Sequence, residues 1–397
     1  MTKIAIKNVY KIFGPNPESV LAQAQDGAGK DEVMEQNGHV IGIRDVSLEI
    51  EPGEIFVVMG LSGSGKSTLI RHINRLIEPT AGQILVDGED VLQLDEAQLR
   101  DLRRHKISMV FQRFGLLPHK TVLENVASGL IIGGIEKDEA EKQAAEEVEL
   151  VGLAGFENHY PQQLSGGMQQ RVGLARALAT DAEILLMDEA FSALDPLIRN
   201  DMQQQLKELQ KRLHKTIVFI THDLDEALRL GDHIAILKDG ELRQVGTPEE
   251  ILLNPADDYV RRFVTDVNRG RVVKAKAVAE TIPTVSVSNL NSENVRVALS
   301  QTSLRGIFVL ADDGSVLGGA NRRLLESCGD AITVDQLLPV VQVLDGAVID
   351  EVLHDSAATE LPLAVTEESG ALFGAVSRQG LMSAIARKPE NGTVRGT

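Results

Sequence analysis

A glycine-rich run from Gly60 to Thr68 joins an apolar segment to a helical pattern, and this junction restricts the fold more than any other feature of the chain. The run has the spacing G-x-x-x-x-G-K-[ST], with a strand-like segment before it and helical periodicity from Ser67 to Leu76 after it. Glycine lets successive backbone N–H groups converge on phosphate oxygens, and the start of a helix adds a favourable dipole. We therefore expect a phosphate-binding loop in an α/β fold. The residues expected to contact a nucleotide there are Gly60, Ser62, Gly63, Ser64, Gly65, Lys66, Ser67 and Thr68.

An acidic pair further along the chain fits the same chemistry. Asp188 ends the apolar run that starts at Ile184, so its carboxylate can hold Mg²⁺ beside the loop together with the Ser67 hydroxyl. Glu189 follows directly and is placed to polarise a water aimed at the γ-phosphorus, while Lys66 would reach the β- and γ-phosphates. An acidic pair at a strand exit is weak evidence alone, but coupled to the loop it predicts nucleotide hydrolysis.

The alternation of segments predicts an α/β core. Residues 184–187 and 216–220 are short continuous apolar runs, as expected of strands buried on both faces of a parallel sheet. Alternation at residues 3–9 predicts a further strand, and residues 15–38 predict a partly helical insertion after it. Residues 136–150 form an acidic helical stretch.

The amino-acid composition restricts the classes of partner and the compartment that we expect for this chain. The formal net charge of -18 argues against nucleic acid, whose phosphates require excess Lys and Arg. No apolar run approaches the ~18 residues needed to span a bilayer, and the N-terminal residues lack a signal-peptide pattern. The single cysteine, Cys328, permits no intrachain disulfide and fits a reducing compartment. We expect a cytoplasmic protein that reaches a membrane only through a partner.

The octapeptide Leu164-Ser-Gly-Gly-Met-Gln-Gln-Arg171 lies between the phosphate loop and the acidic pair. Motifs in this order resemble the ATP-binding cassette (ABC) ATPases over residues 1 to about 268. The resemblance implies a P-loop ABC domain with a RecA-like core, a helical subdomain at about 113–175, and ATP with Mg²⁺ as cofactors. It also implies that Ser165, Gly166 and Gly167 bind the γ-phosphate of the ATP held by an opposite subunit. A Ser–Gly–Gly helix start does offer a hydroxyl and free N–H groups to an anion.

The same resemblance implies roles for four other residues. Gln112 would contact Mg²⁺ and the attacking water, and His222 would contact the γ-phosphate. Asp195 matches the D-loop, in Ser192-Ala-Leu-Asp195, at the seam of a dimer. Phe13 is the best match to the aromatic that stacks on adenine, with Tyr10 as the alternative.

Within that family the chain is most similar to the ATP-binding subunit of glycine betaine/proline betaine importers. The similarity lies in the stretches at residues 10–14, 59–79, 187–199 and 221–227. It implies a homodimer that sandwiches two ATP molecules, a membrane permease docked at about residues 113–164, and an extracytoplasmic solute-binding protein. The chain would then lie at the cytoplasmic face of the inner (plasma) membrane.

Some alternatives to a betaine importer fit the sequence, and others do not. The cassette does not touch the solute, so choline, a polar amino acid or a sulfonate remain alternatives to a betaine. A non-transport ABC protein of DNA repair or translation would need coiled coils, tandem cassettes or basic surfaces. A P-loop kinase would leave residues 164–171 unexplained, and a GTPase would require an Asn-Lys-x-Asp motif, which is absent.

Residues 276–397 contain a weak internal repeat. Residues 307–325 and 363–382 each predict a strand, an acidic-glycine turn, a strand and a helix. This pattern resembles a tandem pair of regulatory CBS modules, and a plain α/β dimerisation domain is the alternative. CBS sites for adenosine nucleotides usually place an Asp near the start of the last helix, and Asn321-Arg-Arg and Ser377-Arg-Gln have none. Nucleotide sensing is therefore doubtful, and sensing of ionic strength or support of a dimer stays open.

Overall fold

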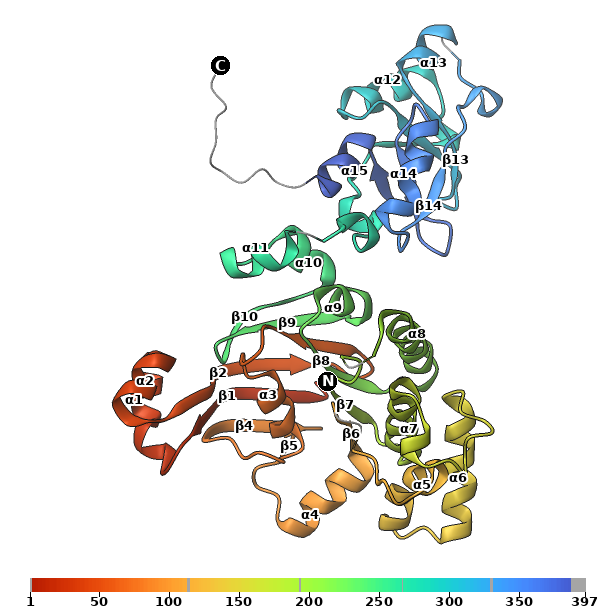
Figure 1. Cartoon of the computed structure of the whole chain (residues 1–397). Helices are drawn as coiled ribbons and strands as arrows, with labels where there is room; N and C mark the ends of the chain where they lie inside the picture. Colours follow the sequence, from red (N-terminus) through yellow and green to blue (C-terminus); the bar gives the residue numbers. More distant parts are fainter. Residues whose placement is uncertain (1, 113–114, 193, 266, 329–330, 387–397) are drawn as a thin grey trace. The chain divides into compact units, whose positions relative to one another are not determined.

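The structure is a computed structural model that describes residues 2–112, 115–192, 194–265, 267–328 and 331–386 (Figure 1). It divides into two compact units, one of residues 1–251 and 255–260 and the other of residues 252–254 and 261–397. Positions 113 and 114, at the start of the expected helical subdomain, and position 193, in the stretch Ser192-Ala-Leu-Asp195, lie outside the described residues.

The first unit is built on a six-stranded sheet with the strand order β10-β9-β3-β8-β7-β6. Neighbouring strands from β9 to β6 are parallel, and β10 is antiparallel to β9. Every residue of β3, β7 and β8 is buried, which explains their continuous apolar sequences. The strands are β3 (Ile55–Met59), β6 (Ile107–Val110), β7 (Ile184–Asp188), β8 (Thr216–Thr221), β9 (His233–Lys238) and β10 (Glu241–Gly246).

A second, antiparallel sheet has the order β2-β1-β4-β5. The expected strand at residues 3–9 extends to Phe13, because β1 stays paired with β2 as far as Phe13 opposite Val40. The strands are β1 (Ile4–Phe13), β2 (Val40–Ile50), β4 (Ala81–Val86) and β5 (Glu89–Asp90).

The insertion between β1 and β2 is helical in part. It contains the 3-10 turn η1 (Pro17–Val20), α1 (Leu21–Gln25) and α2 (Lys30–Asn37). Val20, Ala24 and Val33 bury their side chains against Tyr10, Ile12 and Ile41 of β1 and β2. The insertion is therefore fixed to the antiparallel sheet by a small apolar core of its own.

The main core of this unit lies between the two sheets and α3 (Lys66–Ile73). Ile6 and Ile43 of the antiparallel sheet, Val58 of the parallel sheet and Leu69 of α3 belong to one buried cluster. The helix stops three residues before the expected Leu76, because Arg75 takes a left-handed conformation with φ 52°. This packing fixes the start of α3, and with it the glycine-rich loop, against the end of β3.

The remaining helices of this part of the chain alternate with the strands, as the sequence predicts. Helices α5, α6 and α7 pack on one another, and α7 also contacts β6. Thr121 and Glu124 form a capping box at the start of α5, and Ser165 caps α7. The helices are α4 (Glu96–Asp101), η2 (Leu102–Lys106), α5 (Val122–Ile132), α6 (Lys137–Leu150), η3 (Pro161–Gln163), α7 (Gly166–Ala179), α8 (Pro196–Leu213), α9 (Leu224–Leu230), α10 (Pro248–Leu253) and α11 (Asp258–Val264).

The second unit is a structural duplication. Its sheets β11-β12-β13 and β14-β15-β16 each have a parallel pair followed by an antiparallel pair. The expected strand–turn–strand–helix pattern is present in both halves, and each half also has a short strand and a helix in front of it. These leading strands have only three residues each, too few to show an alternation in the sequence.

The elements of the second unit are η4 (Arg269–Arg271), η5 (Ala275–Val278), β11 (Thr284–Ser286), η6 (Val287–Asn289), α12 (Ser292–Ser300), β12 (Ile307–Leu310), β13 (Val316–Ala320), α13 (Arg322–Ser327), η7 (Val334–Gln336), β14 (Gln342–Leu344), α14 (Ile349–Ala358), β15 (Leu363–Thr366), β16 (Leu372–Val376) and α15 (Arg378–Ile385). Among the helices of the described ranges, none combines the length and the apolarity needed to cross a bilayer.

Candidate functional site

The glycine-rich loop connects β3 to α3 in a conformation that only glycine tolerates at two positions. Gly60 has φ 153° and Gly65 has φ 99°. A Cβ on Gly60 would lie 2.3 Å from the carbonyl oxygen of Leu237, and one on Gly65 would lie 2.4 Å from that of Gly42. The loop is thus held against neighbouring backbone on both sides, which fixes its N–H groups in place.

Lys66 is the buried cation of this loop. Its side chain is 4% exposed, and its Nζ donates hydrogen bonds to the carbonyl oxygens of Gly60 at 2.9 Å and Leu61 at 3.1 Å. Burial lowers the pKa of Lys66, and the carboxylates of Glu189 and Asp188 oppose that shift. The ammonium therefore lies inside the loop, where a phosphate can replace the carbonyl oxygens as its partner.

Asp188 ends β7 beside the start of α3. Its Oδ1 accepts a hydrogen bond from the Ser67 hydroxyl at 2.7 Å, and its Oδ2 accepts one from Arg71 Nη2 at 2.9 Å. The carboxylate is 1% exposed, so both contacts offset the cost of burying its charge. The structure thus brings the hydroxyl and the carboxylate predicted to hold a metal into direct contact.

Three predicted residues converge on the carboxylate of Glu189. Gln112 Nε2 donates to Glu189 Oε2 at 2.9 Å, and His222 Nδ1 lies 3.6 Å from the same oxygen. Lys66 Nζ lies 3.9 Å from Glu189 Oε1. Glu189 itself has a left-handed backbone, with φ 46°, directly after the strand. Such strain in a non-glycine residue is held by the surrounding structure and is typical of functional positions.

Strand order explains this convergence. Gln112, Glu189, His222 and the glycine-rich loop follow β6, β7, β8 and β3, which lie side by side in the parallel sheet (Figure 1). Carboxyl ends of parallel strands meet at one edge of a sheet, where α/β proteins bind their ligands. Residues up to 162 positions apart, from Gly60 to His222, therefore form one site.

The residues of the octapeptide open α7. Ser165 is exposed, and its hydroxyl accepts a hydrogen bond from the Met168 N–H at 3.4 Å. Gly166 is exposed, and a Cβ on Gly167 would lie 2.6 Å from the Ile198 side chain. Asp195, the predicted D-loop residue, is exposed at the N-cap of α8.

Burial separates the two aromatic candidates. Phe13 is 39% exposed at the end of β1 and lies against Gly42, with Lys11 Nζ 5.1 Å from the ring centroid. Tyr10 is only 8% exposed, because its ring packs in the core of the insertion. Phe13 is therefore the more exposed of the two aromatic rings.

Comparison with known proteins identifies the family. Residues 43–192 match the family model described as ABC transporter. The glycine betaine/proline betaine transport system ATP-binding protein of Escherichia coli is 46% identical over 98% of this chain and 99% of its own length. This chain belongs to the ATP-binding subunits of glycine betaine/proline betaine ABC transporters.

Two further matches extend this assignment. The trimethylamine N-oxide transport ATP-binding protein of Pelagibacter ubique is 52% identical, covering 80% of this chain and 94% of the relative. A dimeric ATP-binding cassette solved in a post-hydrolysis state with ADP and Pi is 37% identical. It aligns with a TM-score of 0.53 over 62% of this chain and 98% of the cassette. The chain is an ABC ATPase that binds and hydrolyses ATP.

The ABC ATPase has a donor set that suits Mg²⁺. Ligands at the ~2.1 Å distances of an octahedral Mg²⁺ site lie about 3 Å apart, close to the 2.7 Å between Ser67 Oγ and Asp188 Oδ1. Among the described residues, no group of three or more His, Cys, Asp or Glu side chains could hold a metal by itself.

The sequence motifs do not indicate several residues of the ABC ATPase site. Arg71 lies four residues after Ser67 on α3, so both side chains face Asp188, and that spacing could have indicated it. Arg199 and Asp223 join the D-loop to the segment after His222. No sequence spacing indicates that pair, because its two helices meet only in the tertiary structure.

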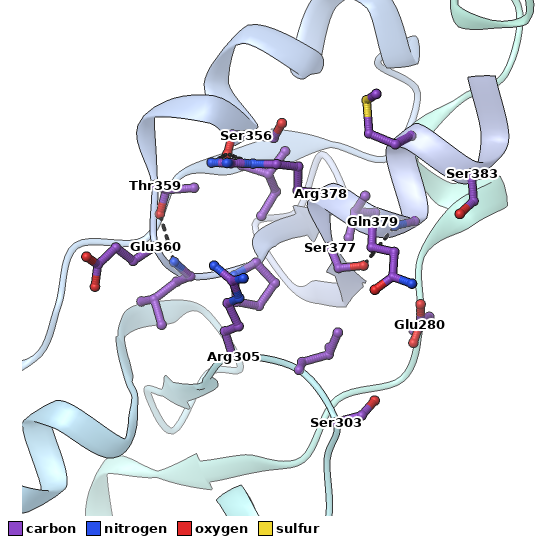
Figure 2. Close-up of a pocket in the computed structure, with 17 residues that line it drawn as sticks. Glu280, Ser303, Arg305, Ser356, Thr359, Glu360, Ser377, Arg378, Gln379 and Ser383 are labelled. Atoms are coloured by element: carbon purple, nitrogen blue, oxygen red, sulfur yellow. Dashed lines mark hydrogen bonds between the residues drawn. The ribbon is translucent and has the colours of Figure 1, made fainter. Parts of the chain in front are cut away.

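The second unit of the ABC ATPase has a cavity of about 720 Å³ between its two halves (Figure 2). Its lining includes two cations and two carboxylates, Arg305, Arg378, Glu280 and Glu360. The Arg378 guanidinium donates to the carbonyl oxygens of Ser356 at 2.8 Å and Ala357 at 3.1 Å. The cavity is thus polar at several points and large enough for a small molecule.

Proposed function

We propose that this ATPase powers an importer of glycine betaine, proline betaine or a related quaternary amine such as choline. Support comes from the E. coli relative, which is named for the two betaines and matches over nearly its full length. Trimethylamine N-oxide, named for another relative, also has a compact, methylated nitrogen. An importer of a different small polar solute, such as an amino acid or a sulfonate, is the alternative.

In the proposed mechanism, Glu189 orients the water that attacks the γ-phosphorus. A bond forms between the water oxygen and phosphorus as the bond to the bridging oxygen of ADP breaks, and Glu189 accepts the proton that the water loses, giving ADP and Pi. Lys66 would stabilise the charge on the β- and γ-phosphates, and His222 would contact the γ-phosphate. The observation that carries this proposal is the approach of Gln112, Lys66 and His222 to one carboxylate.

Ser67, Asp188 and Gln112 would hold Mg²⁺. The ion would neutralise charge on the phosphate oxygens. Arg71 holds Asp188 Oδ2 and leaves Oδ1 beside the Ser67 hydroxyl, so it orients the carboxylate for this role. Phe13 would stack on adenine, and the N–H groups and side chains of residues 60–68 would bind the phosphates.

Two copies of the chain are proposed to bind two ATP molecules head to tail. The exposed start of α7, with Ser165, Gly166 and Gly167, would complete the partner's site, and Asp195 would lie at the seam. ATP would then hold the dimer together and hydrolysis would release it. The related cassette that was solved as a dimer supports this assembly.

Movement of solute requires further subunits in this proposal. Residues 1–268 would be the ABC domain, with the helical subdomain at about 113–175 docking on an integral-membrane permease. The chain would lie at the cytoplasmic face of the plasma membrane, and an extracytoplasmic binding protein would deliver the solute.

Residues 276–397 are proposed to be a tandem CBS-like regulatory domain. Support comes from the duplicated arrangement of a strand, a helix, two strands and a helix, and from the cavity between the halves. The start of neither α13 nor α15 has an acidic residue, so nucleotide sensing is less favoured than sensing of ionic strength.

Transport by the reconstituted complex tests the solute. The chain would be co-purified with its permease and binding protein, and ATP-dependent uptake of labelled glycine betaine would be measured in vesicles. We expect competition by proline betaine or choline and none by taurine or glutamine, with a Glu189→Gln complex as the inactive control. Uptake that only taurine or an amino acid inhibits would favour the alternative.

A further inference from the structure

Arg199 joins two segments of the ATPase that are distant in the sequence. It lies in the first turn of α8, directly after the D-loop, residues 192–195. Its Nη2 donates to the carbonyl oxygen of Leu194 at 3.1 Å and to that of Ser192 at 3.5 Å. Its Nη1 donates to Asp223 Oδ2 at 3.3 Å. One guanidinium therefore holds D-loop backbone and the residue next to His222 at the same time.

Asp223 is itself held in place from its other side. Its Oδ1 accepts the Glu226 N–H at 3.2 Å, which caps α9, and its own N–H donates to Thr221 Oγ1 at 3.0 Å. His222 thus lies between two residues whose positions are fixed by hydrogen bonds. Its own side chain is 56% exposed and projects toward Glu189.

A second side chain of α8, one helical turn after Arg199, forms a buried hydrogen bond to the same segment after β8. Glu226 is 6% exposed and accepts hydrogen bonds from Gln203 Nε2 at 3.0 Å and from the Thr221 hydroxyl. Burial raises the pKa of Glu226. Arg199 and Gln203 are four residues apart and so lie on one face of α8. The Gln203 link is buried, whereas the Arg199 link is partly exposed and reaches the D-loop.

We propose that Arg199 is a positioning residue that couples the D-loop to His222. Asp195 of the D-loop is exposed where the partner subunit would approach, and a shift of the neighbouring carbonyl oxygens of Ser192 and Leu194 would move the guanidinium that binds them. Through Asp223 the same shift would move His222 relative to Glu189. The inference rests on the proposed role of His222 and adds a route by which assembly controls that residue.

The test is Arg199→Lys in the full-length chain, with steady-state ATPase kinetics as the measurement. Lysine keeps the charge but cannot bind two carbonyl oxygens and a carboxylate with one planar group. We expect kcat to fall about tenfold, with KM for ATP within about twofold and an unchanged thermal unfolding midpoint. Arg212→Lys, the same change at an exposed position of α8, is the matched control and should leave all three values unchanged.

Asp223→Asn tests the contact between Arg199 and Asp223 by changing the acceptor. The amide oxygen of asparagine can still cap α9, but the charge that Arg199 binds is lost. We expect a similar fall in kcat, and no further fall when Arg199→Lys and Asp223→Asn are combined. Multiplicative losses in the double variant would overturn the proposal, because the two residues would then act separately. Wild-type kcat in both single variants would also overturn it.

His222→Ala separates this inference from the proposed function. If His222→Ala hydrolyses ATP at the wild-type rate, the proposed role of His222 fails and the coupling fails with it. If His222→Ala loses activity while Arg199→Lys and Asp223→Asn do not, the catalytic role stands and only the coupling is wrong. An Arg199→Lys variant that unfolds at lower temperature would make Asp223→Asn the deciding variant.

Discussion

Gln112 donates a 2.9 Å hydrogen bond to Glu189, although 77 positions separate the two residues in the sequence. They follow β6 and β7, which are adjacent parallel strands, so the sheet places both side chains at the same edge. The contact links the segment that leads into the helical subdomain to the carboxylate proposed to orient the attacking water. If residues 113–175 are the docking subdomain that we propose, this hydrogen bond is one path by which a change there would reach Glu189.

Glu189→Gln should abolish steady-state hydrolysis and trap an ATP-bound dimer. Glutamine keeps the shape of the side chain but cannot accept a proton from the attacking water, so we expect kcat to fall about 100-fold or more. Phosphate release and size-exclusion chromatography with ATP measure the two effects. Glu208→Gln, at an exposed position of α8, is the control. A variant that stays monomeric with ATP and still hydrolyses it would contradict the sandwich mechanism.

Phe13→Ala should weaken ATP binding by about 1–3 kcal/mol, the usual contribution of one stacked base. Titration of the purified chain with a fluorescent ATP analogue checks this. Tyr10→Phe serves as the control, since its ring is buried in the core of the insertion and should not touch the nucleotide. If Tyr10→Phe weakened binding and Phe13→Ala did not, the assignment of the stacking residue would be reversed.

His72 should make the stability of the first unit depend on pH. Its ring is fully buried, Nδ1 faces the Ile77 carbonyl oxygen at 2.7 Å, and burial lowers its pKa to about 4. Between that value and the ordinary 6.5, the unfolded chain binds the proton and the folded chain does not. Stability is therefore lost as pH falls below 6.5, by about 2 kcal/mol from this group at pH 5.

Urea unfolding of the wild type and of His72→Asn at pH 7 and pH 5 measures this contribution. Asparagine can still donate to the Ile77 carbonyl oxygen but does not titrate, so the loss between the two pH values should be smaller in the variant. His105→Gln, at an exposed position, should lose as much as the wild type. Equal losses in His72→Asn and the wild type would show that His72 does not titrate on unfolding.

Removal of residues 276–397 should leave basal ATP hydrolysis intact and change its response to salt in the assembled transporter. The reason is that the residues converging on Glu189 all belong to the first unit. ATPase activity of the vesicle-embedded complex across a range of KCl concentrations measures the response. An identical salt profile with and without these residues would rule out a sensor role.

Much of the site could be predicted from the sequence because its motifs lie at strand ends. The glycine-rich loop, Asp188, Glu189 and His222 each follow a short apolar run, and an α/β alternation implies that such ends share one edge. The duplication of the second unit was visible as a repeat of hairpins. Its leading strands and helices were not, since β11 and β14 acquire their conformation by pairing with β12 and β15.

Residues that act through tertiary contacts could not be predicted. Arg199 and Asp223 are polar residues near helix starts, and nothing in their spacing indicates that α8 and α9 meet there. The choice between Phe13 and Tyr10 was also open, because both precede the insertion on one strand. Val20, Ala24 and Val33 bury Tyr10, which favours Phe13, and burial is a property of the packed insertion.

The sequence by itself determined the phosphate-binding loop, the order of the motifs and the family, because glycine spacing and strand-end carboxylates have few chemical uses. The tertiary structure alone decided which side chains touch. Strand order brings Gln112, Lys66 and His222 to Glu189, and the packing of α8 against α9 brings Arg199 to Asp223. Local spacing specifies backbone shape, but contacts between distant residues depend on how buried apolar faces fit together.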